Sequence, residues 1–566
     1  MSSMIGKNFR VYNAEAFARS FSFSSIYLYV GKVSSWEDDD SPPAPEDHPA
    51  YHNSVKNKMV GLKRIGPDEV RLGAKRYDWT SGNRYERYKS ASSSLGDTNP
   101  YYVLAGYNDR SVYKCLDNNG NSVSTSKPSH KNLGATRELD GYIWKYMYTI
   151  TEADFKKFAT ADVIPVGSDG TVWNASLPSS IINVPISANN TTGIGSYYRG
   201  LGVVNTTYAA SAVNATIFTT VAANTTTNEL RIIADSGFSR VDNYYNNSAF
   251  YITSGTAAGT YRRIIDSKVV TGDTVSNLVF SGTVTSISNG DTFIIGPSVT
   301  ANTTGIDGSG FLGIAKTNRY GNVTSIDISM VGGGFSNGYS NVFVNGLYAT
   351  TSENSPNGTG AEAEIPIPPS GGHGSNIPDE IESRYVIVAP ETALARDHQT
   401  GTFIGYGNDI RQIGMLMNPV ESSTGRVAIN SSYDMRTVLY FANPTNLGFK
   451  VDQRIYNSAT EGQETATGLV YNICGSSSDQ YLTLVDTTGQ FANGDIIYNR
   501  IGDSAIISSS SLQNHEYPLG SGVVPRNSVI SGGIAKYTGD IIYHENIAPI
   551  TRRLDQKEEF KFVFEF

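Results

Sequence analysis

The sequence predicts a mainly β protein, and three observations lead to this prediction. The chain contains 56 glycines, 35 tyrosines and 22 phenylalanines, while only 17% of its residues are charged. Short apolar runs alternate with stretches of Ser, Thr, Asn and Gly, and long amphipathic helical windows are scarce. We therefore expect a multi-layer β-sandwich core built from the N- and C-terminal segments, with inserted small all-β modules and a few short helices.

The end of the chain carries the strongest strand signal. Phenylalanine occupies every second position from 560 to 566, so a period of two places four phenyl rings on one face of a strand. Residues 541–543 predict a second strand, and Pro549 separates the two. The run Ile26–Val30 is rich in strand formers and is the expected pairing partner of the last strand.

Changes in composition divide the chain into five segments. Lys and Arg become rarer after about residue 167, where Asn, Thr, Gly and Ser increase. Short β-prone runs such as 230–233, 250–252, 278–280 and 292–295 then recur between glycine turns, and a similar style returns in runs such as 468–471, 481–485 and 494–497. The expected segments are 1–170, the N-terminal part of the core; 171–365, inserted all-β modules; 366–446, a continuation of the core; 447–515, a small β insert; and 516–566, the closing C-terminal strands.

Three short helices are expected. Asn13 can cap a helix over 13–21, and Thr151 can cap one through Phe158, with acidic residues in its first turn. Apolar residues spaced by four, four and three positions predict a helix over 51–62.

Charge and cysteine content exclude several classes of function. The net charge is −9, which gives no electrostatic basis for coating nucleic acid. Cys115 and Cys474 are the only cysteines, so a disulfide framework and a cysteine zinc site are both excluded, and we expect synthesis in a reducing cytosol. The start of the chain lacks the features of a secretory signal, and no run approaches eighteen apolar residues, so no membrane insertion is expected.

Two aromatic segments have alternative interpretations. Residues 76–82 interleave basic and aromatic side chains, which can stack on bases or sugars, but a protein contact surface or core strand fits the acidic chain better. Residues 142–148 form an aromatic ladder that can stack on sugar rings, although a strand packed inward explains it more simply.

The acidic and histidine-containing motifs provide the candidate sites. Glu37–Asp40 precede two prolines and lack the spacing of a calcium loop, so we expect a solvated loop. His373 lies among glycines, which suggests an exposed ligand or base, but no metal-ligand partner stands beside it, and we favour a turn. A glycine run at 332–334, followed by Phe335, lacks the Gly-Lys-Ser/Thr of a phosphate loop. Carboxylates that glycosidase chemistry would require occur at Asp379, Glu380 and Glu382 and at Glu461 and Glu464, with nothing in the sequence to place them as pairs.

Several segments together resemble the baseplate wedge subunit of contractile-tailed bacteriophages. The resemblance covers roughly 1–170 and 366–566, in the order of that family, and six segments carry it. They are Arg76–Gly82, Val112–Leu116, Gly141–Tyr148, Gly371–Gly374, Asn408–Gly414 and Gly539–Phe566.

The resemblance implies a structural virion protein of the tail baseplate, assembled in the bacterial cytoplasm. It implies no enzyme activity, so no catalytic, cofactor-binding or metal-binding residues are assigned and no cofactor is expected. The implied partners are other wedge subunits and the arm proteins that attach fibres, with a homodimer expected. The alternatives are a tail fibre or receptor-binding protein, which would be a trimer with a repetitive shaft, and a polysaccharide-binding or polysaccharide-degrading tail protein.

Overall fold

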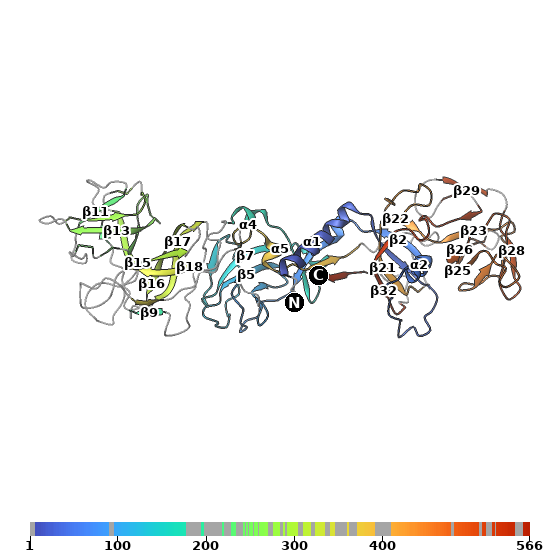
Figure 1. Ribbon diagram of the computed structural model, residues 1–566, viewed down its shortest axis with the longest axis horizontal. Helices are drawn as coiled ribbons and strands as arrows, with labels where there is room; N and C mark the ends of the chain where they lie inside the picture. Colours follow the sequence, from blue (N-terminus) through green and yellow to red (C-terminus); the bar gives the residue numbers. More distant parts are fainter. Residues whose placement is uncertain are drawn as a thin grey trace, which may run out of the picture. The chain divides into compact units, whose positions relative to one another are not determined.

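The computed structural model confirms a mainly β fold with several antiparallel sheets and a few short helices (Figure 1). The structure describes residues 6–89, 95–176, 194–196, 218–219, 228–233, 242–345 with short gaps, 359–361, 369, 371–390, 409–445, 447–476, 480–508, 512–516, 523–526, 528–549 and 559–566.

The chain folds into two compact units. Unit 1 combines the two ends of the chain, Met1–Gly73 and Arg384–Phe566, and unit 2 is the intervening segment Ala74–Ser383. Each unit has hydrophobic clusters of its own, and each is described by itself below.

A five-stranded antiparallel sheet forms the centre of unit 1. Its strand order is β22-β2-β1-β21-β32, so β1 lies in the middle and hydrogen-bonds to β2 and β21. The strands are β1 (Ile26–Gly31), β2 (Met59–Arg64), β21 (Gln412–Met417), β22 (Ser432–Asp434) and β32 (Asp540–Asn546). Segments from both ends of the chain therefore share one sheet.

The last strand pairs with a different partner from the expected one. The strand β33 (Phe562–Glu565) pairs antiparallel with β20 (Tyr385–Val388), which in turn pairs with β3 (Val70–Lys75). The predicted pairing with Ile26–Val30 is wrong, because both edges of β1 are already occupied. The phenyl rings still reach the same hydrophobic core as Ile26 and Leu28, so the segments meet through side chains.

The first helix covers this core. Helix α1 (Lys7–Phe23) is longer than the expected 13–21, and its Phe17 ring contacts Phe21, Phe564 and Phe566 at centroid distances of 5.3 to 5.4 Å. The expected alternation of the last strand is present, with Phe562 buried and the neighbouring Val563 exposed. One face of α1 and the last strand thus pack together.

The second helix is shorter than expected. Helix α2 (Pro49–Lys58) starts at a proline and ends before Met59, whereas the apolar spacing predicted a helix to Leu62. The residues from Met59 onwards instead form β2, because pairing with β1 satisfies their backbone groups within the sheet. Met59 and Leu62, which the helical spacing would have buried, are buried in the strand instead.

A second sheet in unit 1 has seven strands in the order β28-β27-β24-β25-β26-β23-β31. It includes the predicted strands 468–471 and 481–485. It also contains strands from outside the predicted insert 447–515, one before it and one after it. Its strands are β23 (Thr437–Tyr440), β24 (Arg454–Tyr456), β25 (Thr467–Cys474), β26 (Tyr481–Thr488), β27 (Ile496–Tyr498), β28 (Ser504–Ile506) and β31 (Val529–Ile530); a separate hairpin pairs β29 (Leu512–Glu516) with β30 (Val523–Arg526).

A four-stranded sheet in the order β4-β5-β7-β6 organises the first part of unit 2. Its strands are β4 (Tyr102–Leu104), β5 (Ser111–Asp117), β6 (Ala135–Arg137) and β7 (Ile143–Thr149). Every residue of β5 and all but the last of β7 are buried, so the aromatic ladder packs inward, as the simpler interpretation predicted. Trp144 and Tyr142 stack with a centroid distance of 5.6 Å.

The rest of unit 2 contains further antiparallel strands. A nine-stranded sheet has the order β11-β14-β13-β12-β15-β16-β17, with β10 and β18 also paired to β15. Its strands are β10 (Phe218–Thr219), β11 (Glu229–Ile233), β12 (Ser248–Ile252), β13 (Tyr261–Val269), β14 (Val275–Phe280), β15 (Thr292–Thr303), β16 (Ser309–Thr317), β17 (Val323–Gly333) and β18 (Ser340–Asn345); β9 (Ile194–Ser196) pairs with β19 (Thr359–Ala361). The end of the predicted glycine turn, 334–335, lies outside the described residues.

Short helices and one further strand complete the described elements: η1 (Pro67–Glu69), α3 (Glu152–Phe158), α4 (Gly170–Asn174), α5 (Ile377–Glu380) and β8 (Val163–Pro165). Thr151 caps α3 by accepting the Asp154 N–H, which confirms the predicted cap. Among the helices that the structure describes, none has the length and apolarity needed to cross a membrane.

Candidate functional site

A buried cluster of charged and polar side chains joins β5 to the glycine-rich segment 371–380 in unit 2. The Lys114 ammonium donates to Glu380 Oε2 and to His373 Nδ1, the latter at 2.8 Å. The side chains of Lys114 and Glu380 are 0% and 1% exposed. The Tyr88 ring covers the same Lys114 nitrogen at 4.2 Å from its centroid. We call Lys114, His373, Glu380 and Tyr88 the lysine cluster.

Local turns place Glu380 and His373 in this cluster. Asn376 caps α5 through the Asp379 N–H, and α5 delivers Glu380 one turn later. Glu380 Oε1 accepts the backbone N–H groups of Gly374 and Asn376 at 2.8 and 3.3 Å. Gly374 has a φ of +95°, and a Cβ there would meet Val172 Cγ1 at 2.6 Å, so the turn requires glycine.

His373 is not exposed, contrary to the expectation. Gly372 and Gly374 both have positive φ, and the turn that they form folds the imidazole inward until only 4% of His373 is exposed. Its ring packs edge-on against Tyr88 at 5.6 Å. The prediction of a turn that depends on its glycine backbone is confirmed. In addition, the imidazole of His373 hydrogen-bonds to Lys114.

Burial controls the protonation of this cluster. Loss of solvent lowers the pKa of Lys114, partly opposed by the neighbouring Glu380 carboxylate. The pKa of His373 falls well below its usual range because of burial and because two lysines, Lys114 and Lys145, face it. Burial also lowers the pKa of Lys145 to about 8 and raises that of Tyr88. The low-polarity surroundings therefore favour a neutral imidazole and make deprotonation of the Lys114 ammonium easier than in water.

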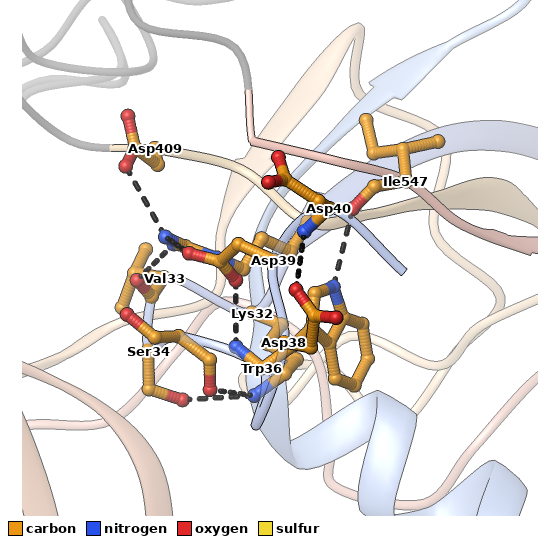
Figure 2. Close-up of polar contacts among 11 residues, drawn as sticks. Lys32, Val33, Ser34, Trp36, Asp38, Asp39, Asp40, Asp409 and Ile547 are labelled. Carbon is orange, nitrogen blue, oxygen red and sulfur yellow. Dashed lines mark hydrogen bonds and ion pairs between the residues drawn. The ribbon is translucent and has the colours of Figure 1, made fainter. Parts of the chain in front are cut away.

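A second polar cluster in unit 1 is built around Arg411. Figure 2 shows Val33, Asp39 and Asp409 of this cluster. Its guanidinium forms a two-pronged pair with Asp39, with Nε to Oδ1 at 2.8 Å and Nη2 to Oδ2 at 2.7 Å. It also donates to the Val33 carbonyl at 2.7 Å and to Asp409 at 3.3 Å. We call Arg411, Asp39, Asp409 and the Val33 carbonyl the arginine cluster.

The arginine cluster fixes the loop that follows β1. The Arg411 backbone N–H donates to the carbonyls of Gly31 and Lys32, and the Arg411 carbonyl accepts the Ile547 N–H. The Trp36 indole N–H donates to the Ile547 carbonyl at 3.1 Å, which ties the loop to the segment after β32 (Figure 2). Three segments far apart in sequence are thus connected.

The acidic run is only partly the solvated loop that we expected. Glu37, Asp38 and Asp40 are exposed, as predicted, but Asp39 is partly buried against Arg411. The expectation failed at Asp39 because its cation partner lies 372 residues away in the sequence. The arginine fork lowers the pKa of the Asp39 carboxyl to about 2 and raises that of Arg411.

The exposed face of α1 is the third feature of interest. Phe9, Tyr12, Ala16, Arg19 and Phe23 are all exposed and follow one another at spacings of three, four, three and four. This alternation is the a/d spacing of helices that pack side by side. Phe9, Tyr12 and Phe23 are 55%, 62% and 87% exposed. We call these five residues the α1 seam.

The remaining carboxylate candidates lie in different surroundings. The side chain of Asp379 accepts from Asn376, and Glu382 has a positive φ of 52° within the turn that follows α5. Glu461 is exposed, whereas Glu464 lies 3.3 Å from the Arg500 guanidinium. Both Glu380 and Glu464 therefore serve ion pairs.

The segment 76–82 is occupied by internal contacts. Arg76 pairs with Asp78 at 2.9 Å and donates to the Thr160 carbonyl. The Tyr77 ring packs edge-on against Tyr102, and the Trp79 indole N–H donates to Ser124 Oγ. This agrees with the interpretation of the rings as part of the core.

Sequence reasoning missed the roles of Lys114 and Arg411. Both lie in segments that predict strands, and neither was assigned a partner. A signal was present for Lys114, since one lysine interrupts a run of strand formers over 112–116 and a buried ammonium requires a counter-charge. For Arg411 the sequence contains no comparable signal, because its position at a strand start is also typical of exposed arginine.

Within the described residues, no group of three or more His, Cys, Asp or Glu side chains is placed to hold a metal ion. No protein-family model matches the chain, and no curated protein matches it.

Proposed function

We propose that this protein is a structural wedge subunit of a phage contractile-tail baseplate and that it acts by protein–protein contact without transforming a substrate. The α1 seam is the observation that carries the proposal. It presents three aromatic side chains to solvent on a helix whose opposite face is held in the core of unit 1. An aromatic surface on a helix that is packed against the core is suited to binding a neighbouring subunit.

The spacing of the seam indicates the kind of surface that would cover it. Positions three and four apart on one helix face accommodate a second helix. Arg19 lies on the seam with its side chain 65% exposed. A partner helix with an apolar stripe and an acidic residue opposite Arg19 would match it, and Arg19 already pairs with Glu15 of the same helix at 2.6 Å.

The area of the seam sets the strength of this contact. Aromatic side chains each bury about 150 to 250 Å² when fully covered, so the exposed parts of Phe9, Tyr12 and Phe23 provide roughly 400 Å². A stable interface needs about 800 Å² per partner. The seam is therefore one of several contacts, as in a multiprotein ring where many moderate interfaces cooperate.

The polar clusters support the same proposal. In the lysine and arginine clusters, charged groups bind one another and backbone groups of the same chain. They hold strands and loops in place, which is what an assembly subunit requires of its framework.

Co-expression with the other wedge proteins of the same phage tests the proposal. We expect a complex that survives affinity purification and size-exclusion chromatography, and we expect the Phe9→Ser/Phe23→Ser variant to bind at least about tenfold more weakly. Trp173→Ser is the matched control, because Trp173 is 61% exposed and lies in unit 2. A folded chain that forms no complex, or equal weakening by the control, would overturn the proposal.

A further inference from the structure

The lysine cluster has the arrangement of a reaction site whose two reactants belong to the same chain. We propose that Lys114 and Glu380 condense to form an intramolecular isopeptide bond, with His373 as the proton carrier. The proposal is independent of the assembly function, since it concerns a covalent modification inside unit 2.

The amine and the carboxyl group are held together in a site from which water is excluded. Lys114 Nζ donates to Glu380 Oε2, and the two side chains are 0% and 1% exposed. Both lie on ordered elements, β5 and α5. Fixed proximity replaces the encounter of two reactants, which is worth many orders of magnitude in rate.

Burial favours the reactive form of the Lys114 amine. In water, an amine and an acid exist as a solvated ion pair that does not condense. Removing that solvation disfavours the charged amine, so burial lowers the pKa of Lys114, and the neighbouring Glu380 carboxylate opposes part of this effect. A desolvated lysine amine is a nucleophile, as in enzymes that form covalent lysine intermediates. The Tyr88 ring closes one side of the amine at 4.2 Å.

The second oxygen of Glu380 lies where an oxyanion would be stabilised. Oε1 accepts the N–H groups of Gly374 at 2.8 Å and Asn376 at 3.3 Å. Two backbone donors on one carboxyl oxygen form the arrangement that stabilises tetrahedral intermediates of acyl transfer. The positive φ of Gly374 is part of the turn that presents its N–H, so the glycine requirement serves this geometry.

His373 is placed to move the proton. Its Nδ1 accepts from Lys114 Nζ at 2.8 Å, and its own low pKa keeps it neutral and able to accept a proton. Oε2 first receives one proton from the Lys114 ammonium within the ion pair, so that an amine faces a carboxylic acid. Lys114 Nζ then attacks Glu380 Cδ, and a C–N bond forms while the negative charge gathers on Oε1. His373 takes a second proton from the attacking nitrogen and delivers it to Oε2, which leaves as water when the Cδ–Oε2 bond breaks. One amine and one carboxylic acid give one amide and one water, with no oxidant or reductant.

The cross-link would have a clear mechanical role. It would join β5 to the segment that precedes β20, and it would restrict the unfolded chain as a disulfide does. The chain has no disulfide, because Cys115 and Cys474 are both free. An isopeptide bond needs no oxidising compartment, so it can supply the covalent cross-link that a disulfide would otherwise provide.

Intact-mass spectrometry of the purified full-length protein under denaturing conditions tests the proposal. We expect the chain to be lighter than its calculated mass by about 18 Da, the mass of one lost water. A tryptic digest should contain one branched peptide that joins the residues around Lys114 to those around Glu380, because trypsin no longer cleaves after Lys114.

Two variants make the result specific. Lys114→Arg keeps the charge but lacks the nucleophilic amine, so it should have its calculated mass. Glu382→Gln changes a carboxyl group two residues away and should keep the loss of water. His373→Gln should slow the appearance of the lighter species by at least about tenfold when newly synthesised chain is sampled at intervals by mass spectrometry.

The wild-type digest decides the question even where a variant does not fold. If the folded wild type has its calculated mass and yields separate linear peptides containing Lys114 and Glu380, the cluster is an ion pair only and the proposal is wrong.

Discussion

The lysine cluster and the arginine cluster each hold a cation against a carboxylate, but they do so in different surroundings. The Lys114 and Glu380 side chains are almost completely buried, whereas the Asp39 and Asp409 side chains that face Arg411 are each 29% exposed. The guanidinium keeps its charge and distributes it over a fork of donors, while a buried amine can become neutral. The same pairing of charges thus forms a stable ion pair in the arginine cluster and favours the proposed condensation in the lysine cluster.

The difference also separates two energetic costs. A fully buried pair has lost nearly all hydration, so removal of one member leaves an uncompensated charge or an unpaired donor. A partly exposed pair can recover water when it is broken. The predictions below test this contrast in decreasing order of expected effect.

The largest effect is expected from Glu380→Leu, which keeps the volume of the side chain but removes the partner that Lys114 has both in the ion pair and in the proposed amide. Breaking a buried pair costs about 3 to 5 kcal/mol. Amide hydrogen exchange of the full-length protein, followed by mass spectrometry, should show the free energy of opening of 111–117 and 371–381 reduced by this amount.

The control for this change is Glu152→Leu. Glu152 pairs with Lys156 on the surface of α3, where the two side chains are 61% and 63% exposed. This variant should leave exchange throughout unit 2 unchanged. Equal effects of the two substitutions would show that burial does not distinguish the lysine cluster.

A smaller effect is expected from Arg411→Met, which removes every side-chain donor of the arginine cluster. Asp39 and Asp409 can be hydrated again, so the expected loss is about 1 to 3 kcal/mol, measured as faster amide exchange over 32–40. Arg411→Lys should recover only part of it, since an ammonium cannot form the two-pronged pair with Asp39. A complete rescue by lysine would contradict the geometric account.

The smallest effect is a difference in acid sensitivity. The folded-state pKa of His373 lies below its unfolded value, so the unfolded chain binds more protons as pH falls below about 6.5 and the lysine cluster loses stability from there. For Asp39 the folded pKa is about 2, against an unfolded value near 3.9, so its contribution is present above about pH 4 and is lost between pH 4 and 2.

Amide exchange should be measured from pH 7.5 to 3.5 and corrected for intrinsic rates. As the pH falls, we expect residues 371–381 to lose protection at a higher pH than residues 33–40. His373→Gln should remove the pH dependence of 371–381 that begins below about pH 6.5. Loss of both regions at one pH would show that a single global transition, not the two clusters, governs acid stability.

The sequence predicted elements better than it predicted their partners. The alternation of 560–566 identified the last strand, but β20 and not Ile26–Val30 completes its ladder. The apolar spacing over 51–62 fitted a helix, yet sheet pairing converts the end of that stretch into β2 from Met59. In both cases local periodicity was compatible with several pairings, and the competition among strands decided between them.

The candidate sites show the same limit. His373 was singled out because glycines surround it, but its burial depends on Lys114, which is 259 residues away. Asp39 belonged to an acidic run whose other members are exposed, and only Arg411 distinguishes it. Local spacing contains no information about contacts of this range.

By itself, the sequence determined the β class, the positions of many strands and the inward packing of the aromatic ladder, because these depend on propensity and on alternation over a few residues. Only the tertiary structure decided which strands pair, which of the charged groups are buried and which helix face remains in water. Those outcomes depend on contacts between segments hundreds of residues apart, where each group must find its counter-charge or hydrogen-bond partner in three dimensions.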